Sequence, residues 1–200
     1  MAIDQILLIG HTHHDVGYTA SPRTVDPLHA RIVGRVLELC GEHDEPGPAQ
    51  FRWTFEVARP VLAFLDSATP AEVARLAELV QAGRISVTGG YLNMTQLPGE
   101  AEFDAAYRQL QRIRRHGIPV RTEQHGDVNG IAWGIVPAMR RAGLDRLVMA
   151  LNPDHGRPPF RQPTGFSWVG PDGRPVFVWL STHYGFGEEW GIVDGDTELA

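Results

Sequence analysis

The chain has little cysteine and no long hydrophobic run. Its 200 residues include a single cysteine, Cys40, so an intramolecular disulfide is excluded. No stretch approaches the roughly 18 consecutive apolar residues of a transmembrane helix, and no basic, apolar and small-residue pattern of a signal peptide begins the sequence. We therefore expect a soluble, cytoplasmic protein with no membrane partner.

Positive charge is also scarce. The sequence has 18 basic residues, all arginine, against 24 acidic residues, and its formal net charge is −6. The densest basic stretch, Arg112–Arg115, lies on a predicted amphipathic helix, where it is interpreted as a solvated face. This distribution argues against nucleic acid as a partner. The hydrophobic fraction of 42% is enough for a sizeable core in one domain.

Apolar strands alternate with amphipathic helices along most of the chain. The expected strands cover residues 6–9, 51–55, 85–88, 120–125 and 147–151. Helices are expected over residues 28–39, 70–80, 100–115 and 133–142. This alternation predicts parallel β/α units with right-handed crossovers.

The alternating pattern of strands and helices ends near residue 153. Phe166–Val169 and Val176–Leu180 flank the turn sequence Gly170–Gly173, and together they predict a β-hairpin. About five parallel strands are too few to close a β/α barrel. We therefore interpret residues 1–200 as a single, incomplete catalytic-type β/α domain with a hairpin-containing extension over residues 151–200. Such a domain is expected to self-associate or to belong to a longer polypeptide.

Metal-ligating residue types cluster at the end of the first expected strand. His11, His13, His14 and Asp15 fall within five positions. Residues two apart in an extended segment point the same way, so His13 can share a ligand sphere with His11 or with Asp15. Imidazole and carboxylate ligands suit zinc or a similar divalent ion with one position open for substrate. A lone histidine is more often structural, but this density favours a metal site.

Polar residues also follow other expected strands. Glu56 follows the second strand, Tyr91 the third and Asp127 the fourth. The carboxyl ends of parallel strands meet at one edge of a sheet, so these loops should converge on the same rim as the histidine cluster. The local sequence leaves Asp127 open between a site residue and a turn formed with Asn129 and Gly130.

Four segments, in order, resemble glycoside hydrolase family 38, the zinc-dependent retaining α-mannosidases. They are HTHHDVGYT from His11, FRWTFEVARPVLAFL from Phe51, LVQAGRISVTGGYLNM from Leu79 and GDVNGIAWGIVPAMRRAGLD from Gly126. The resemblance covers about residues 5–150. It implies a seven-stranded β/α barrel of which this chain holds the N-terminal part, and a carbohydrate with α-linked sugars as the substrate.

The resemblance also implies roles for individual residues. His13, Asp15 and Asp127 would bind one divalent metal, most simply zinc, and Asp127 would also be the nucleophile that forms a glycosyl-enzyme. Tyr18 would replace the family's tryptophan under the sugar ring, and Tyr91 could stack on the same ring.

Other positions depart from the family pattern or lack a match in it. Val128 and Asn129 stand where the family usually has proline and an aromatic residue, which implies a different sugar pocket. His11 would support the ligands, and His14 occupies a position that is not a ligand in the family. The family's fourth ligand, a histidine, and its acid/base aspartate have as candidates here His155, His183, Asp154, Glu188 and Glu189.

Two alternatives stay open at this point. One is a hydrolase of the amidohydrolase or deacetylase type, in which the metal activates water and Asp127 is a ligand or base. The other is a non-catalytic fragment that binds metal or sugar but has no acid.

Overall fold

The computed structural model describes residues 9–47, 50–94, 97–158 and 160–185. Its helices are α1 (Pro22–Glu42), α2 (Arg59–Leu65), α3 (Pro70–Gln81), α4 (Glu100–Arg108), α5 (Leu110–Arg114) and α6 (Ile135–Arg141). Its strands are β1 (Trp53–Phe55), β2 (Ile85–Val87), β3 (Thr122–Gly126), β4 (Arg146–Ala150), β5 (Thr164–Val169) and β6 (Pro175–Ser181). The predicted alternation of strands and helices is confirmed in this part of the chain.

The described strands form two sheets, ordered β1-β2 and β3-β4-β6-β5. All neighbours are parallel except the antiparallel pair β5 and β6. The Gly89 N–H donates to the Thr122 carbonyl at 2.8 Å and so joins the end of β2 to the start of β3. This is a mixed α/β fold. The described residues form six short strands in two sheets, and no pairing joins the edge strand β5 to β1 to close a barrel. The predicted seven-stranded barrel is therefore not confirmed.

The predicted hairpin forms, but it is part of the larger sheet. β5 pairs with β6 from Thr164 opposite Leu180 to Val169 opposite Pro175. β6 also pairs in parallel with β4, with Met149 opposite Leu180. The hairpin therefore adds a further parallel strand to β3 and β4, and the carboxyl end of β6 lies at the same edge as theirs.

Local sequence signals explain where several helices begin and end. Thr69 and Glu72 form a reciprocal capping box at the start of α3, with Pro70 in the first turn. Gly83, with a φ of 71°, follows the end of that helix. The helix predicted over residues 100–115 is divided at Gln109 into α4 and α5.

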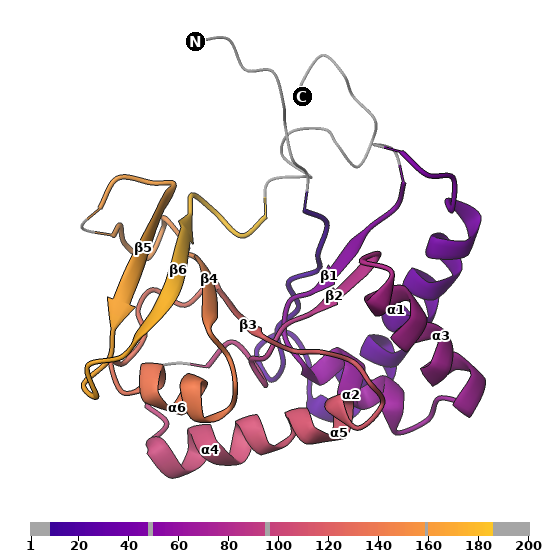
Figure 1. Cartoon of the computed structure of the whole chain (residues 1–200), viewed down its shortest axis with the longest axis horizontal. Helices are drawn as coiled ribbons and strands as arrows, with labels where there is room; N and C mark the ends of the chain where they lie inside the picture. The colour runs from indigo at the N-terminus through magenta and orange to yellow at the C-terminus, as the bar shows by residue number, and fades with distance from the viewer. Residues whose placement is uncertain (1–8, 48–49, 95–96, 159, 186–200) are drawn as a thin grey trace, which may run out of the picture.

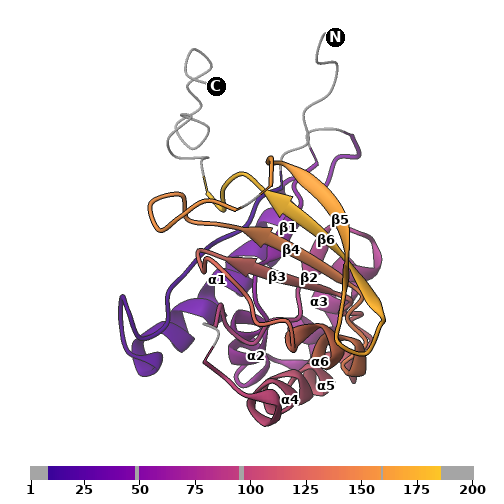
Figure 2. The ribbon, with the colours of Figure 1, turned by 90° about the vertical axis from the view of Figure 1, so that its left-hand side faces the viewer.

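One group of helices packs against one side of the strands. Figures 1 and 2 both place α2, α4, α5 and α6 on the lower side of the sheets. One core cluster joins these layers and includes the fully buried side chains of Leu76, Leu110, Ile113, Leu147 and Val178. Within the described residues, no helix combines the length and hydropathy needed to cross a membrane.

The first predicted strand lies mostly outside the described residues. Its last residue, Ile9, is described and is 73% exposed, so the prediction of a buried strand is wrong at this position. An isolated parallel bridge between His11 and Thr54 is the contact that aligns this segment with β1. It places the histidine cluster beside the end of β1.

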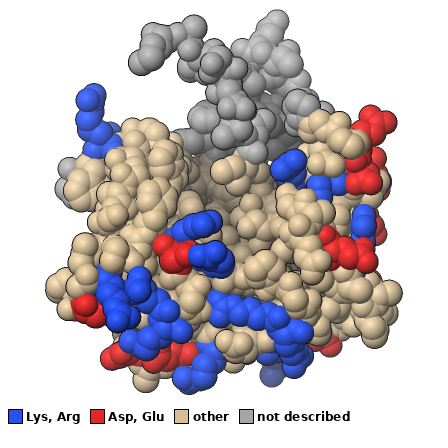
Figure 3. Space-filling view, viewed as in Figure 1, with Lys and Arg blue, Asp and Glu red and all other residues tan. Residues whose placement is uncertain are grey.

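Charged side chains on the lower face are mixed in sign. Figure 3 shows arginines and acidic residues interleaved there. Arg112 pairs with Asp66, and Arg141 pairs with Glu100 and Asp104. The solvated-face interpretation of the arginine-rich helix agrees with this arrangement.

One buried carboxyl group makes stability depend on pH. Glu123 on β3 lies next to Tyr107 of α4, and its burial raises its pKa to about 8. The unfolded chain ionises this group above roughly pH 4.3 while the folded chain keeps it protonated, so the group's contribution to stability is lost as the pH rises toward about 8. We expect Glu123→Gln to stabilise the protein at the alkaline end of this window by a few kcal/mol and to have a smaller effect near pH 5. Urea unfolding at both pH values measures this, and equal pH dependence in the two proteins contradicts it.

Candidate metal centre

Two loops bring the predicted ligand residues together. The ligand atoms of His13, Asp15 and Asp127 all lie within 4.8 Å of one another. His13 Nε2 lies 3.6 Å from Asp15 Oδ1 and 3.9 Å from Asp127 Oδ2. His13 and Asp15 come from the loop before α1, and Asp127 directly follows β3. The convergence of strand ends expected from the sequence therefore occurs for this set.

The chemistry of this group fits a divalent metal ion. It offers one imidazole nitrogen and two carboxylates, which are donors that zinc accepts. His13 Nε2 is buried and has no hydrogen-bond partner among the described residues. A buried polar atom without a partner is costly, and a metal ligand bond at this atom would remove that cost.

Glu56 holds the histidines of the loop. It lies at the end of β1, is 2% exposed, and accepts hydrogen bonds from His13 Nδ1 at 2.7 Å and His11 Nδ1 at 2.9 Å. Burial raises the pKa of Glu56, but these two hydrogen bonds outweigh it and lower the pKa to about 2. Burial lowers the pKa of His13, but the Glu56 carboxylate, together with Asp15 and Asp127, outweighs that effect and raises it. The contacts with His11 and His13 thus favour the ionised form of Glu56.

Asp127 is held in an uncommon backbone conformation. Its φ is 65°, in the left-handed region that non-glycine residues seldom occupy outside constrained positions. Its N–H donates to the Ala150 carbonyl at 3.0 Å, and its Oδ1 accepts from Asn152 Nδ2 at 2.8 Å. Asn129 holds Asn152 in turn through bonds to the Asn152 backbone. These hydrogen bonds of Asp127 thus go to the end of β4 and the segment after it, and not to Asn129 or Gly130. Its Oδ2 lies 3.9 Å from His13 Nε2.

Tyr184 is a site residue that the sequence did not indicate. Its ring centroid lies 4.6 Å from that of His13, and its hydroxyl bonds to the Asp127 carboxylate. Burial and this bond raise the pKa of Tyr184 to about 12. Burial raises the pKa of Asp127, but the bonds from Asn152 and Tyr184 outweigh it and lower the pKa. Tyr184 follows β6, so recognition of β6 as a parallel strand would have pointed to it.

The predicted sugar-stacking residues lie apart from these contacts. Tyr18 is 93% exposed. The Tyr91 hydroxyl accepts from Arg59 Nη1 at 2.9 Å, and the Arg59 guanidinium lies 5.4 Å from the centroid of the Tyr91 ring. Tyr91 thus lines a groove shared with Asp26 and Arg112. Sugar stacking by either tyrosine stays a prediction.

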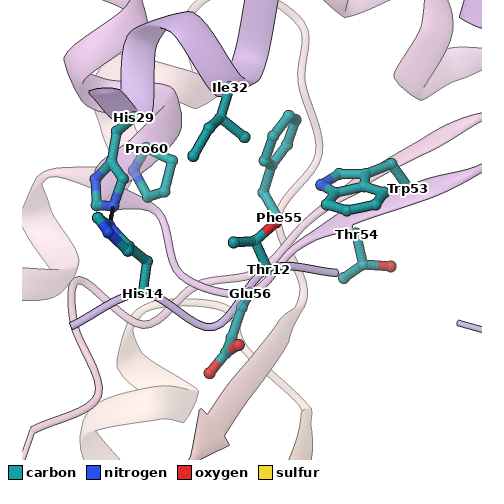
Figure 4. A pocket seen from close by; sticks show the side chains of 9 residues that line it. All are labelled: Thr12, His14, His29, Ile32, Trp53, Thr54, Phe55, Glu56 and Pro60. Atoms are coloured by element: carbon teal, nitrogen blue, oxygen red, sulfur yellow. Dashed lines mark hydrogen bonds between the residues drawn. The ribbon is translucent and has the colours of Figure 1, made fainter. Parts of the chain in front are cut away.

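His14 faces a helix and not the ligand group. Its Nδ1 lies 2.9 Å from Nε2 of the buried His29 on α1. Figure 4 shows these two rings meeting on one side of a small pocket, with the Glu56 carboxylate directed away from them. Burial and the neighbouring His14 lower the pKa of His29 to about 4. This placement agrees with the expectation that His14 is not a ligand.

The described candidates for the fourth ligand and the acid follow β4 and β6, and His155 helps to lower the pKa of Asp127. Asp154 and His155 are exposed on the loop after β4. His183 stacks on Tyr184 with ring centroids 4.6 Å apart. Glu188 and Glu189 lie outside the described residues.

Gly126 provides a direct test of how tightly this site is packed. A Cβ at residue 126 would lie 2.6 Å from Glu56 Oε1 and 3.4 Å from His13 Nδ1. We expect Gly126→Ala to displace the Glu56 carboxylate and to weaken zinc binding about tenfold, as loss of a ligand-supporting contact does. Gly134→Ala, which has no atom within 4 Å of the added carbon, is the matched control. Chelator competition measures both affinities, and equal values in the two variants contradict the expectation.

The sequence matches a known family model over nearly its whole length. The model is described as the glycosyl hydrolases family 38 N-terminal domain, and it matches residues 4–197. None of the curated proteins compared with the chain matches it.

Solved structures share the fold. A protein in glycosyl hydrolase family 38 from Enterococcus faecalis has a TM-score of 0.57 at 18% identity, over 96% of this chain and 21% of that one. An alpha-mannosidase from Enterococcus faecalis V583 has a TM-score of 0.61 at 18% identity, over 86% of this chain and 19% of that one. A 4-alpha-glucanotransferase from Thermococcus litoralis has a TM-score of 0.57 at 15% identity, over 85% of this chain and 26% of that one. The chain therefore spans about a fifth to a quarter of these structures.

Proposed function

Because this chain belongs to glycosyl hydrolase family 38, as the match to its N-terminal domain over residues 4–197 establishes, we propose that it is part of a metal-dependent, retaining glycoside hydrolase of the α-mannosidase type. The observation that carries the proposal is the grouping of His13, Asp15 and Asp127 within 4.8 Å. A chain with a single cysteine needs no oxidising compartment, which is compatible with a cytoplasmic location of the protein.

The three grouped residues would hold one divalent ion, with zinc the best match to their donors. When bound, the ion supplies Lewis acidity toward sugar hydroxyl oxygens and helps to stabilise the charge of an oxocarbenium-like state. The chain's own residues supply the remaining steps. Asn152 fixes one oxygen of Asp127 at 2.8 Å, which leaves Oδ2 on the side of His13.

Asp127 is the proposed nucleophile. Its lowered pKa keeps the carboxylate ionised, so an oxygen can attack the anomeric carbon while the bond to the leaving oxygen breaks. In retaining enzymes a second carboxyl group, about 5–5.5 Å away, gives the leaving oxygen its proton and later takes a proton from the water that releases the sugar. The Tyr184 hydroxyl bonds to Asp127 and restrains the carboxylate for this attack.

We also propose that the two sheets are consecutive parts of a seven-stranded β/α barrel. Support comes from the bond between Gly89 and Thr122, which joins them into one row. In that row β1 to β4 follow one another in chain order and β6 comes next, without the reversal of a doubly wound sheet. The remaining strands would come from a longer polypeptide, or self-association would cover the sheet edges that they leave unpaired.

Stereochemistry and metal dependence test the proposed function together. In the full-length protein, we expect hydrolysis of an aryl α-mannoside to release α-mannose first, which early proton NMR spectra can record. Removal of metal by a chelator should abolish turnover, and zinc should restore it. Release of the β-anomer, or full activity in the presence of chelator, contradicts the proposal.

A further inference from the structure

We propose that Glu56 is a positioning residue that fixes the tautomer of His13 and couples the His13 loop to β3, the strand that directly precedes Asp127. This inference rests on the proposed function because it assigns Glu56 a role toward the same metal ligands. It concerns a side chain to which the sequence gave no role beyond its place at a strand end.

The Glu56 carboxylate gathers donors from two different segments. His11 Nδ1 donates to Oε2 at 2.9 Å, and His13 Nδ1 donates to Oε1 at 2.7 Å. Asn93 Nδ2, from the segment after β2, also donates to Oε1 at 2.7 Å. A buried, ionised carboxylate is costly unless several donors surround it. Three donors meet that condition and leave Glu56 with little freedom to move.

The bond to Glu56 decides which nitrogen of His13 is available. Nδ1 lies at hydrogen-bond distance from Glu56, whereas Nε2 lies 3.6 Å from Asp15 Oδ1 and 3.9 Å from Asp127 Oδ2. In the neutral ring, a proton on Nδ1 leaves the lone pair of Nε2 directed at the two carboxylates. The opposite tautomer would place a proton at Nε2, where it would block ligation. A carboxylate behind a ligating histidine acts in this way in metal sites generally.

Asn93 extends the connection to β3, the strand that ends directly before Asp127. Its Oδ1 accepts from the Gly126 N–H at 3.1 Å, one residue before Asp127. Glu56 therefore contacts His13 directly and reaches the Asp127 backbone through Asn93 and Gly126. Movement of Glu56 would disturb the spacing between His13 and Asp127, which come from separate loops.

Zinc affinity is the first measurement. We expect Glu56→Gln to weaken zinc binding 10- to 100-fold in competition with a chromophoric chelator. The neutral amide oxygen accepts a weaker hydrogen bond from His13 Nδ1 than a carboxylate does, and the amide N–H₂ group places a hydrogen-bond donor where Glu56 has only acceptors. Glu123→Gln makes the same change at another buried strand residue and should leave zinc affinity within about threefold of wild type. Circular dichroism melting verifies that both variants fold. Wild-type affinity in a folded Glu56→Gln variant overturns the proposal.

The tautomer of His13 is the second measurement, and it needs no variant that might misfold. In metal-free wild-type protein, at a pH where His13 is neutral, nitrogen NMR should place its proton on Nδ1. A proton on Nε2 overturns the proposal. A shift of the population toward Nε2 in Glu56→Gln supports it, because a loss of packing alone would not select one nitrogen.

The two measurements separate this proposal from the proposed function. If wild-type protein binds no zinc but Glu56→Gln still changes the His13 tautomer, the metal-dependent function fails and the positioning role stands. If wild-type protein binds zinc through His13 and Glu56→Gln leaves both affinity and tautomer unchanged, the positioning role alone fails.

Discussion

Asp127→Asn is expected to abolish the covalent glycosyl-enzyme and to lower hydrolysis by roughly 10⁴-fold or more, as loss of a nucleophile does in other hydrolases. An amide is a very poor nucleophile, but its oxygen can still accept from Asn152 and offer a weak metal ligand. The variant should therefore fold and keep part of its metal affinity. A fluorinated glycoside that forms its glycosyl-enzyme quickly and hydrolyses slowly should leave a sugar mass on the wild-type peptide HGDVNG and none on the variant.

The same experiment separates the glycosidase from the alternative metal hydrolase. If metal-bound water attacks the substrate directly, turnover proceeds and the fluorinated glycoside leaves no covalent adduct on the wild-type protein. Asp127→Asn then either retains substantial activity or loses activity while the absence of an adduct stays the same. Asp172→Asn, at an exposed turn residue, is the control for the substitution itself. An adduct on a peptide other than the one containing Asp127 would move the nucleophile elsewhere.

Loss of His13 or Asp15 is expected to remove the metal. We expect wild-type protein to retain about one divalent ion per chain after mild dialysis, and His13→Ala and Asp15→Ala each to weaken binding by more than about 100-fold. That loss exceeds the 10–100-fold range typical of residues that only support a ligand, because each change deletes a donor atom from a set of three. Elemental analysis and chelator competition measure the content and the affinity.

The control for metal loss is a histidine that does not face the site. His43 is exposed after the end of α1, and His43→Ala should leave metal content unchanged. Unchanged metal content in both His13→Ala and Asp15→Ala would falsify the assignment of the metal centre. A loss in only one of them would remove the other residue from the ligand set.

Several features could be predicted from local sequence because local physics fixes them. The Thr69–Pro70 pair predicted the start of α3, and the capping box with Glu72 confirms it. The apolar run near residue 147 predicted β4, which is observed at Arg146–Ala150. The turn at Gly170–Gly173 predicted the hairpin of β5 and β6. Each signal acts over a few residues, so neighbouring residue types are enough to specify it.

Other features depended on contacts between distant segments. The sequence did not indicate that β6 would pair in parallel with β4, because the pairing of a hairpin with an earlier strand is set by sheet packing and not by the turn. For the same reason Asn152 and Tyr184 went unrecognised, although both follow parallel strands. Ile9 was expected to be buried, but burial depends on neighbours that its own sequence does not specify.

For the candidate site, the sequence by itself determined which kinds of donor are available and that they follow strands. Residue types and their positions indicated a metal site at the histidine cluster but left Asp127 open, and the resemblance to glycoside hydrolase family 38 selected His13, Asp15 and Asp127. Only the tertiary structure decided that these three meet, that Glu56 holds Nδ1 of His13, and that His14 turns away to His29. The physical reason is that these distances follow from the packing of separate strands and loops, which brings together side chains that no local spacing rule connects.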